Sequence, residues 1–168
     1  MEDPSLRAWF NAVDTDRGGT VDARELQQAF NSANMHFSLH ACAMLIRIYD
    51  TSRTGQVNFQ QFCALHNFIV TVQRSFLEFD GDRNGVLDAH EVSLALQRNG
   101  FVLDPPAFRS LMVAFDPERR GVLRMDDYIQ MASFLSSAKS MFAAFDPHGT
   151  GTIHLNFSQF VYASSHLR

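Results

Sequence analysis

Five copies of one short pattern recur along the chain, and this repeat limits the fold more than any other feature. In each copy an aspartate is followed five residues later by a glycine and seven residues later by an aliphatic residue. The five aspartates are Asp14, Asp50, Asp80, Asp116 and Asp146. Their spacings are 36, 30, 36 and 30 residues, which gives a larger period of 66 residues. Because a fixed period of this size indicates repeated supersecondary units, we interpret the chain as two pairs of units followed by a single fifth unit.

The segments between the loops have the periodicity of helices. Apolar residues recur every three or four positions from Phe62 to Phe79, and again from Tyr128 to Phe145, which is the pattern of one helical face. We expect each segment to be one long helix shared by two loops. Ser38 and Asp104 are candidate caps of shorter helices. No long alternating run is present, so we predict an all-α fold, with very short β pairings where the aliphatic loop residues meet, in one domain over residues 1–168.

The third loop, residues 80–91, has the ligand pattern of a calcium site. A 12-residue helix–loop–helix calcium site uses oxygens at positions 1, 3 and 5, a backbone carbonyl at 7, often a water at 9, and a two-oxygen carboxylate at 12. The third loop has a suitable group at every one of these positions. The predicted ligands are Asp80, Asp82, Asn84, the carbonyl of Val86, Asp88 and Glu91.

The first loop, residues 14–25, is predicted to be a second calcium site. Gly18 leaves position 5 without a side chain, and we expect a water molecule to replace that ligand. The loop still has four acidic residues, as many as the third loop. Its predicted ligands are Asp14, Asp16, the carbonyl of Thr20, Asp22 and Glu25.

The second and fourth loops are weaker candidates for calcium. Loop 50–61 ends at Gln61, whose neutral amide cannot clamp an ion with two charged oxygens. Loop 116–127 places Arg120 at a ligand position, and a cation there repels a divalent ion at short range. Its last ligand, Asp127, is shorter than glutamate, so any residual binding is expected to favour the smaller Mg²⁺.

The fifth loop, which begins at Asp146, is predicted to bind calcium poorly. Its LNFSQF at 155–160 matches VNFQQF at 57–62, but its asparagine lies two residues further into the loop. This two-residue insertion places Phe157 at position 12 by simple counting, and Ser158 is the residue expected at position 12 once the insertion is allowed for. Asp146 is therefore the only carboxylate available in this loop.

The fifth unit has no partner within the chain, so we expect it to contact another molecule. Pairing of two fifth units across a two-fold axis would bury an apolar patch. The predicted dimer interface contains Ile153, Phe157, Phe160, Val161 and Tyr162. The alternative is that the fifth unit packs against its own core.

Composition excludes several other functions. The formal charge of −4 is mild and the 14 basic residues are dispersed, so no nucleic-acid partner is predicted. Cys42 and Cys63 have no paired spacing, and we expect both to be reduced in an intracellular protein. The apolar stretch from Phe62 to Val72 is too short to span a membrane. No nucleophile–base arrangement can be built from the sequence, so we predict that the protein is not an enzyme.

The five units, their spacing, the shared long helices and the insertion in the last loop together resemble the penta-EF-hand family. The resemblance covers nearly the whole chain. Within the family, DTDRGGTVDARELQQAF at 14–30 looks like the branch of the apoptosis-linked calcium-binding adaptor and peflin, because the first loop is a regular 12-residue loop that begins with aspartate.

This resemblance implies five EF-hand units, called hands below, on about eight helices. It implies Ca²⁺ in hands 1 and 3, and a homodimer or a heterodimer with another penta-EF-hand protein through hand 5. Members of this branch bind proline-rich segments of membrane-trafficking and cell-death adaptors, and move from cytosol to membranes with calcium.

We therefore expect a cytoplasmic calcium sensor and adaptor that exposes apolar clefts and captures partner peptides. Two other functions fit the sequence. The first is a calcium buffer whose surface barely changes on binding. The second is a regulatory subunit that pairs through hand 5 with a larger penta-EF-hand protein.

Overall fold

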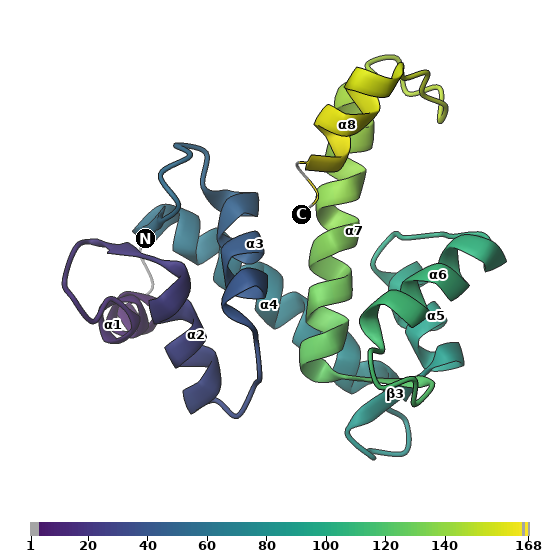
Figure 1. Ribbon diagram of the computed structural model, residues 1–168. Coiled ribbons are helices and arrows are strands. Elements are labelled where there is room, and N and C mark those ends of the chain that lie inside the picture. The colour runs from purple at the N-terminus through teal and green to yellow at the C-terminus, as the bar shows by residue number, and fades with distance from the viewer. Residues whose placement is uncertain (1–3, 166, 168) are drawn as a thin grey trace.

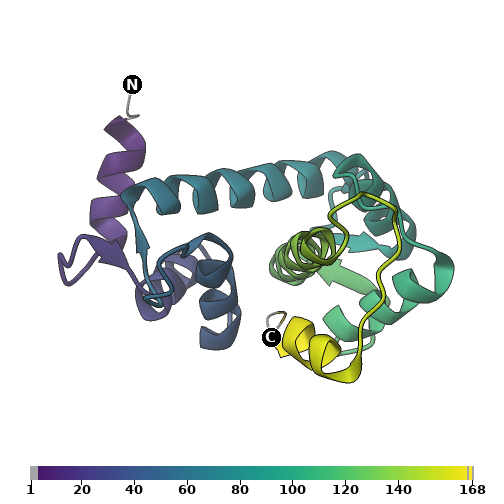
Figure 2. The same cartoon turned by 90° about the horizontal axis from the view of Figure 1, so that it is seen from above.

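The computed structural model describes residues 4–165 and residue 167. Within them, the chain forms eight helices and two small antiparallel sheets (Figures 1 and 2). The elements are α1 (Pro4–Val13), β1 (Thr20–Val21), α2 (Ala23–Ser32), α3 (Leu39–Tyr49), β2 (Val57–Asn58), α4 (Phe59–Phe79), β3 (Val86–Asp88), α5 (Ala89–Arg98), α6 (Pro105–Phe115), β4 (Val122–Arg124), α7 (Met125–Phe145) and α8 (Phe157–Ser165). The prediction of an all-α fold with short strands is confirmed.

The two predicted helix caps are present. The side chain of Ser38 accepts a hydrogen bond from the N–H of Ala41 at the start of α3. Asp104 does the same for the N–H of Ala107 at the start of α6, where prolines occupy the first turn. Each cap satisfies a backbone donor that has no partner inside its helix. These local signals fix where the first helix of hand 2 and the first helix of hand 4 begin.

The aliphatic loop residues pair the hands in twos. Val21 lies opposite Val57 in the β1–β2 sheet, and Leu87 lies opposite Leu123 in the β3–β4 sheet. All four side chains have an exposed fraction of 0%. Hands 1 and 2 therefore form one pair, and hands 3 and 4 form another, as the 66-residue period predicts.

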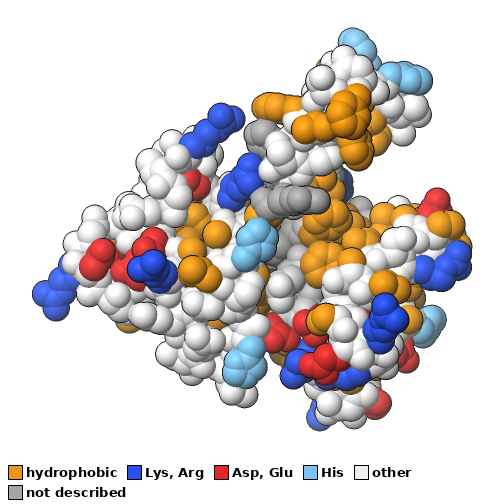
Figure 3. Space-filling model, in the orientation of Figure 1, with side chains coloured by type: hydrophobic (Ala, Val, Ile, Leu, Met, Phe, Trp, Pro, Cys, Tyr) orange, Lys and Arg blue, Asp and Glu red, His pale blue; other side chains and the backbone are white. Residues whose placement is uncertain are grey.

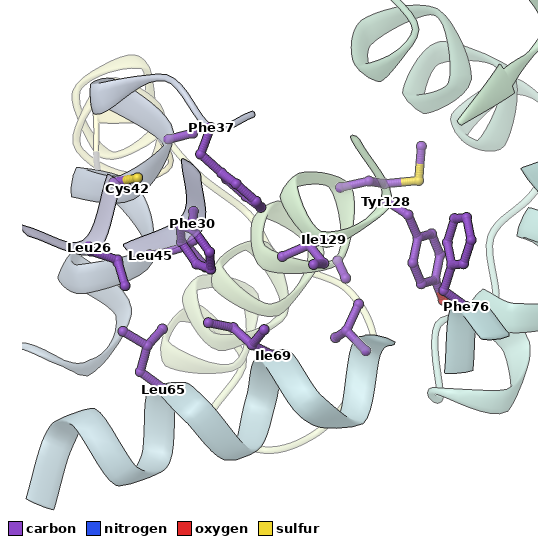
Figure 4. Close-up of a cluster of buried hydrophobic side chains, with 14 of the residues drawn as sticks. Leu26, Phe30, Phe37, Cys42, Leu45, Leu65, Ile69, Phe76, Tyr128 and Ile129 are labelled. Carbon is purple, nitrogen blue, oxygen red and sulfur yellow. The ribbon is translucent and has the colours of Figure 1, made fainter. Parts of the chain in front are cut away.

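The long helices α4 and α7 carry the core that joins the two pairs. Leu65 and Ile69 of α4 face α2 and α3, and Phe76 lies beside Tyr128 of α7 (Figure 4). The apolar face of α7 is buried only as far as Leu135, whereas Phe142 is 38% exposed. The carboxyl half of α7 projects from the rest of the molecule together with α8 (Figure 1). The similar sequence periodicity of α4 and α7 thus leads to different burial, since the buried positions of α4 extend to Phe76 near its end and those of α7 stop at Leu135.

The two cysteines differ in their surroundings. Cys42 is fully buried and Cys63 is half-buried, and the described chain contains no disulfide between them. Burial raises the pKa of the Cys42 thiol to about 12, because a thiolate is poorly solvated in an apolar interior. No helix of the described chain combines the length and the apolar composition needed to cross a bilayer.

We expect iodoacetamide to label Cys63 of the native protein at pH 8 while Cys42 stays unmodified. With a pKa of about 12, only about one Cys42 in 10⁴ is a thiolate at pH 8, and the thiolate is the reactive form. Mass spectrometry of peptides after a timed alkylation measures both sites. Unfolding in guanidinium is the control, and it should make the two cysteines react alike. Equal labelling rates in the native protein would contradict the burial of Cys42.

Candidate metal centre

The structure brings three predicted ligands of the first loop together. One carboxylate oxygen each of Asp14, Asp16 and Glu25 lie within 4.8 Å of one another. Asp14 and Glu25 are buried, with exposed fractions of 6% and 8%, whereas Asp16 is exposed. Several carboxylates held this close repel one another, and a bound divalent cation relieves that repulsion. The donor set therefore fits a hard cation such as Ca²⁺.

Backbone donors position these carboxylates. The N–H groups of Gly18 and Gly19 donate to the two oxygens of Asp14, each at 2.9 Å. Oε1 of Glu25 accepts the N–H of Thr15 at 2.9 Å, and its Oε2 accepts the N–H of Asp22 at 3.0 Å. The side chain of Asp22 in turn caps α2, so the residues at loop positions 9 and 12 form a capping box. The same residues that start the helix are the ones that the sequence predicts to hold the ion.

The glycine at position 5 of the first loop has a steric role. A Cβ at Gly18 would lie 2.9 Å from Oδ1 of Asp16, which is closer than such atoms approach in proteins. The N–H of Gly18 donates to that same oxygen at 2.7 Å. Gly18 thus allows Asp16 to lie close to the loop backbone; in the third loop, where Asn84 stands at this position, the equivalent hydrogen bond to Oδ1 of Asp82 is longer, at 3.1 Å. Thr20, whose carbonyl is the predicted ligand at position 7, lies in β1 opposite Asn58.

The third loop has the same scaffold with a looser arrangement of carboxylates. Asp88 and Glu91 form the capping box of α5, and Oδ1 of Asp80 accepts the N–H of Asn84 at 3.0 Å. The Asn84 amide donates to Oδ2 of Asp82 at 2.8 Å. Among the described residues, only the first loop gathers three acidic ligands within 4.8 Å. The third loop has a complete set of ligand types, whereas the first is the more closely assembled.

The second loop is closed by a neutral amide. Oε1 of Gln61 accepts the N–H of Asn58 at 2.9 Å, and its Nε2 donates to Oγ1 of Thr51 at 3.0 Å. The Oδ2 of Asp50 accepts the N–H of Gly55 at 2.7 Å. Gln61 thus makes the helix-capping contact that Glu25 makes in the first loop, without the charge that a tightly bound calcium ion requires.

The fourth loop pairs its acids with arginines. Nε of Arg120 lies 3.1 Å from Oε2 of Glu118, and Arg124 also approaches Glu118. Burial raises the pKa of Asp127, and the neighbouring charge of Asp126 raises it further. The fourth loop is thus the least favourable of the four for a divalent cation.

The fifth loop satisfies its one carboxylate internally. Asp146 accepts the N–H of Thr150 at 2.8 Å and the N–H of Gly151 at 2.7 Å, and the hydrogen bond from Thr150 is the largest cause that lowers the pKa of Asp146. The expectation that Ser158 takes the corrected twelfth position is wrong. Gln159 takes it, because Asn156 and Gln159 exchange the same pair of hydrogen bonds as Asn58 and Gln61.

The apolar side chains of the fifth hand are exposed. Ile153 is half-buried, and among the described residues the fifth loop contributes no strand. Figure 3 shows apolar side chains gathered on the arm that projects at the top of the molecule. The exposed fractions are 81% for Phe157, 59% for Phe160, 47% for Val161 and 54% for Tyr162. These five residues, Ile153 included, are called the hand-5 patch below.

Two adjoining clefts lie between α3 and α7, and although the sequence analysis expects apolar clefts, it does not indicate this place for them. The larger is about 730 Å³, and its lining includes Arg47 and Arg53. The smaller is about 260 Å³ and is mainly apolar, with Phe115 and Phe134 in its wall. Met44 lines both. The sequence signal for these clefts is in residues 39–49, which contain more apolar residues than one buried helical face requires.

The sequence and the structure are similar to proteins already described. The family profile for the EF-hand domain pair matches residues 3–65 and 70–133. Penta-EF hand domain-containing protein 2 of Dictyostelium discoideum is 32% identical over 154 residues, which cover 92% of this chain and 74% of that protein. Peflin of Danio rerio is 31% identical over 94% of this chain. This chain spans 59% of that peflin's length, so the peflin contains sequence with no counterpart here.

A solved structure is similar over almost its whole length. It is a homolog of programmed cell death 6 protein from Leishmania major Friedlin, with a TM-score of 0.74 and 36% sequence identity. The match covers 97% of this chain and 94% of that one. The similarity therefore extends through the fifth helix–loop–helix unit as well as the two pairs.

Proposed function

Because this chain is a calcium-binding protein of the penta-EF-hand family, we propose that it is a calcium sensor and adaptor. Calcium binds at hands 1 and 3 and changes the two adjoining clefts between α3 and α7. A partner peptide then binds in the smaller, mainly apolar cleft. The hand-5 patch forms a dimer with a second penta-EF-hand chain. The observation that carries the sensor proposal is the carboxylate cluster of the first loop, which lies at the start of a helix packed against the wall of the cleft.

The predicted ligands of hand 1 are contributed by both ends of the loop, next to the two helices that flank it. Asp14 follows α1 directly, and Glu25 lies in the first turn of α2. Ligands that close around an ion change the angle between two such helices, as in calcium sensors of this class. Because α2 packs on α3, and α3 carries Met44 into both clefts, a movement of α2 reaches the cleft wall through one intervening helix.

Hand 3 reaches the opposite wall of the cleft. Its predicted ligand Val86 lies in β3, which pairs with β4, and β4 leads directly into α7. Phe115 at the end of α6 and Phe134 of α7 contact each other in that wall, with ring centroids 5.8 Å apart. Ions in the two hands thus act on the two sides of one cleft, which supports a shared binding site for the partner.

The chemistry of the cleft favours a proline-rich peptide as the partner. Proline-rich segments adopt an extended helix before binding and dock in grooves lined by aromatic side chains. The smaller cleft offers Phe115 and Phe134, together with the flexible thioether of Met44, which adapts to different shapes. A calcium buffer would need no such surface.

The hand-5 patch supports dimerisation. The four residues equivalent to Ile153 are paired and have an exposed fraction of 0%, whereas Ile153 has no strand partner in the described chain. A second fifth loop offers the same edge, and two copies related by a two-fold axis satisfy each other. The same patch accepts the fifth hand of a different penta-EF-hand protein, so the homodimer and the heterodimer share one contact surface.

The sensor proposal is tested by peptide binding with and without calcium. We expect a fluorescein-labelled proline-rich decapeptide to bind in 1 mM calcium and to be released in excess chelator, as measured by fluorescence polarisation. Met44→Glu should weaken binding at least about tenfold, because it puts a charge on the cleft wall, while calorimetry shows unchanged calcium binding. Leu77→Glu, at a residue that is 66% exposed on α4, is the matched control.

Two results would count against the sensor. Peptide affinity that is independent of calcium would indicate a constitutive subunit. Calcium binding with no peptide affinity, and no rise in the fluorescence of an apolar dye, would indicate a buffer.

A further inference from the structure

The fourth loop carries positive charges at two of the positions that supply ligands in the third loop. Position 5 is Arg120 and position 9 is Arg124, where the third loop has an amide and a carboxylate. Arg120 connects two acids of the loop. Its Nε lies 3.1 Å from Oε2 of Glu118 at position 3, and its Nη2 lies 3.8 Å from Oδ2 of Asp127 at position 12.

Arg124 connects the same two acids from the other side. Its Nη2 lies 3.7 Å from Oε1 of Glu118, and its Nε lies 3.9 Å from Oδ2 of Asp127. The side chains at positions 3, 5, 9 and 12 thus form one network of alternating charge. In a calcium loop these four positions converge on the ion. Both of these acids therefore have two guanidinium neighbours.

We infer that the guanidinium groups of Arg120 and Arg124 take the structural role of the metal ion in hand 4. They neutralise Glu118 and Asp127, draw positions 3 and 12 of the loop together, and hold it closed at every calcium concentration. This inference goes beyond the proposed function and is independent of whether hands 1 and 3 bind calcium.

The surroundings of Asp127 explain why a cation is needed there. Its chain neighbour Asp126 is also acidic and is buried, with an exposed fraction of 8%. Asp116, at position 1, is buried as well, and its Oδ1 has no hydrogen-bond partner among the residues that the structure describes. Without a positive charge nearby, Asp127, whose side chain is 16% exposed, would keep its negative charge beside Asp126 in a poorly solvated region. The two arginines supply that charge from within the chain.

The pairing of hands gives this network a consequence for hand 3. β4 of the fourth loop pairs with β3 of the third through Leu123 and Leu87. If hand 4 is closed by its own side chains, the third loop always has a folded partner, and ion binding there needs no second ion. We therefore expect calcium binding by hand 3 to follow a single-site curve without cooperativity inside the pair.

The test measures the thermal stability of the protein in excess chelator at low salt. The Arg120→Ser/Arg124→Ser variant is expected to unfold about 2–4 °C below wild type. The effect is modest because the arginine side chains are 34% and 48% exposed, and solvent weakens such pairs. In 1 M salt the difference should shrink, because salt screens the network.

The matched control is Arg109→Gln/Arg119→Asn, which removes two positive charges from the same hand. Arg109 and Arg119 are exposed and form no ion pair within the described chain. Asparagine tolerates the positive φ of 53° at position 119. The control should unfold within about 1 °C of wild type at the same salt concentration, because exposed unpaired charges contribute little.

A rescue experiment separates the ion-like role from general stabilisation. Without its two arginines, the fourth loop retains Asp116, Glu118 and Asp127, so millimolar calcium should bind it and close the gap in unfolding temperature to wild type. Equal unfolding temperatures of variant and control would overturn the inference, as would a gap that calcium does not reduce. If the double variant fails to fold, Arg120→Ser alone is compared with Arg119→Asn under the same conditions.

Discussion

Replacing Glu25 with glutamine is expected to remove calcium from the first loop while leaving the loop folded. Glutamine keeps the oxygen that accepts the N–H of Asp22 but loses the charge that clamps the ion. The second loop already contains this substitution in effect, because Gln61 accepts the N–H of Asn58 at 2.9 Å. We expect the affinity of the first loop to fall from the sensor range of roughly 10⁻⁷–10⁻⁵ M to about 10⁻⁴ M or weaker. Isothermal titration calorimetry measures the loss as one ion fewer per chain.

The same substitution in the third loop completes the experiment. Glu91→Gln should remove the second ion, and the double variant should bind none in the micromolar range and should no longer capture peptide in a calcium-dependent manner. Glu78→Gln makes the same chemical change at an exposed position of α4 and is the control. An unchanged number of bound ions in the double variant would show that the first and third loops are not the calcium sites.

Charged residues in the hand-5 patch are expected to convert a dimer into a monomer of 19.0 kDa. Ile153→Asp/Phe160→Asp places one carboxylate at the predicted strand edge and another on α8, where Phe160 is 59% exposed. Burying two carboxylates without partners costs at least about 2 kcal/mol each, so the dissociation constant should rise by roughly 1,000-fold or more. Sedimentation velocity over a range of protein concentrations measures the change.

Two features make the dimer experiment specific. Calcium binding at hands 1 and 3 should be unaffected, because the hand-5 patch lies on the projecting arm. Leu77→Asp introduces a charge at another exposed apolar residue and should leave the dimer intact. A dimer that persists in the Ile153→Asp/Phe160→Asp variant would place the interface elsewhere. A wild-type protein that is monomeric at all concentrations would favour packing of hand 5 against its own core.

The sequence predicts the fold well because its signals are local and repeated. Each of these signals acts within a few residues and can be recognised in a single sequence. They are the Asp–Gly loops, the caps Ser38 and Asp104, and the spacing of apolar residues in α4. The strand pairs are predicted by the same repeat, because the aliphatic residue at loop position 8 always lies seven residues after the aspartate. Val21 and Leu87 meet their predicted partners for this reason.

What the sequence did not predict depends on contacts between distant segments. The clefts require α3 and α7 to lie opposite each other, and no local pattern encodes that distance. From the sequence, Arg120 predicts only repulsion of an ion, because the sequence does not show that Arg120 and Arg124 reach the same two carboxylates. The twelfth position of the fifth loop is occupied by Gln159 and not by Ser158, because Gln159 lies three residues after Asn156 and exchanges hydrogen bonds with it.

The equal lengths of α4 and α7 bear on how this chain can change during evolution. Each helix has 21 residues and joins the end of one loop to the first aspartate of the next, Asp80 or Asp146. Inserting one residue in α4 would turn everything beyond it by about 100° and shift it by about 1.5 Å, so the pair of hands 3 and 4 would rotate as a unit relative to hands 1 and 2, and α7 would lose its packing register on α3. An insertion in a surface loop does not rotate the helices that follow it in this way. The two extra residues of the fifth loop are an insertion in a loop. Divergence in length is therefore expected in the loops and at the ends of the chain, while the two shared helices keep their residue count.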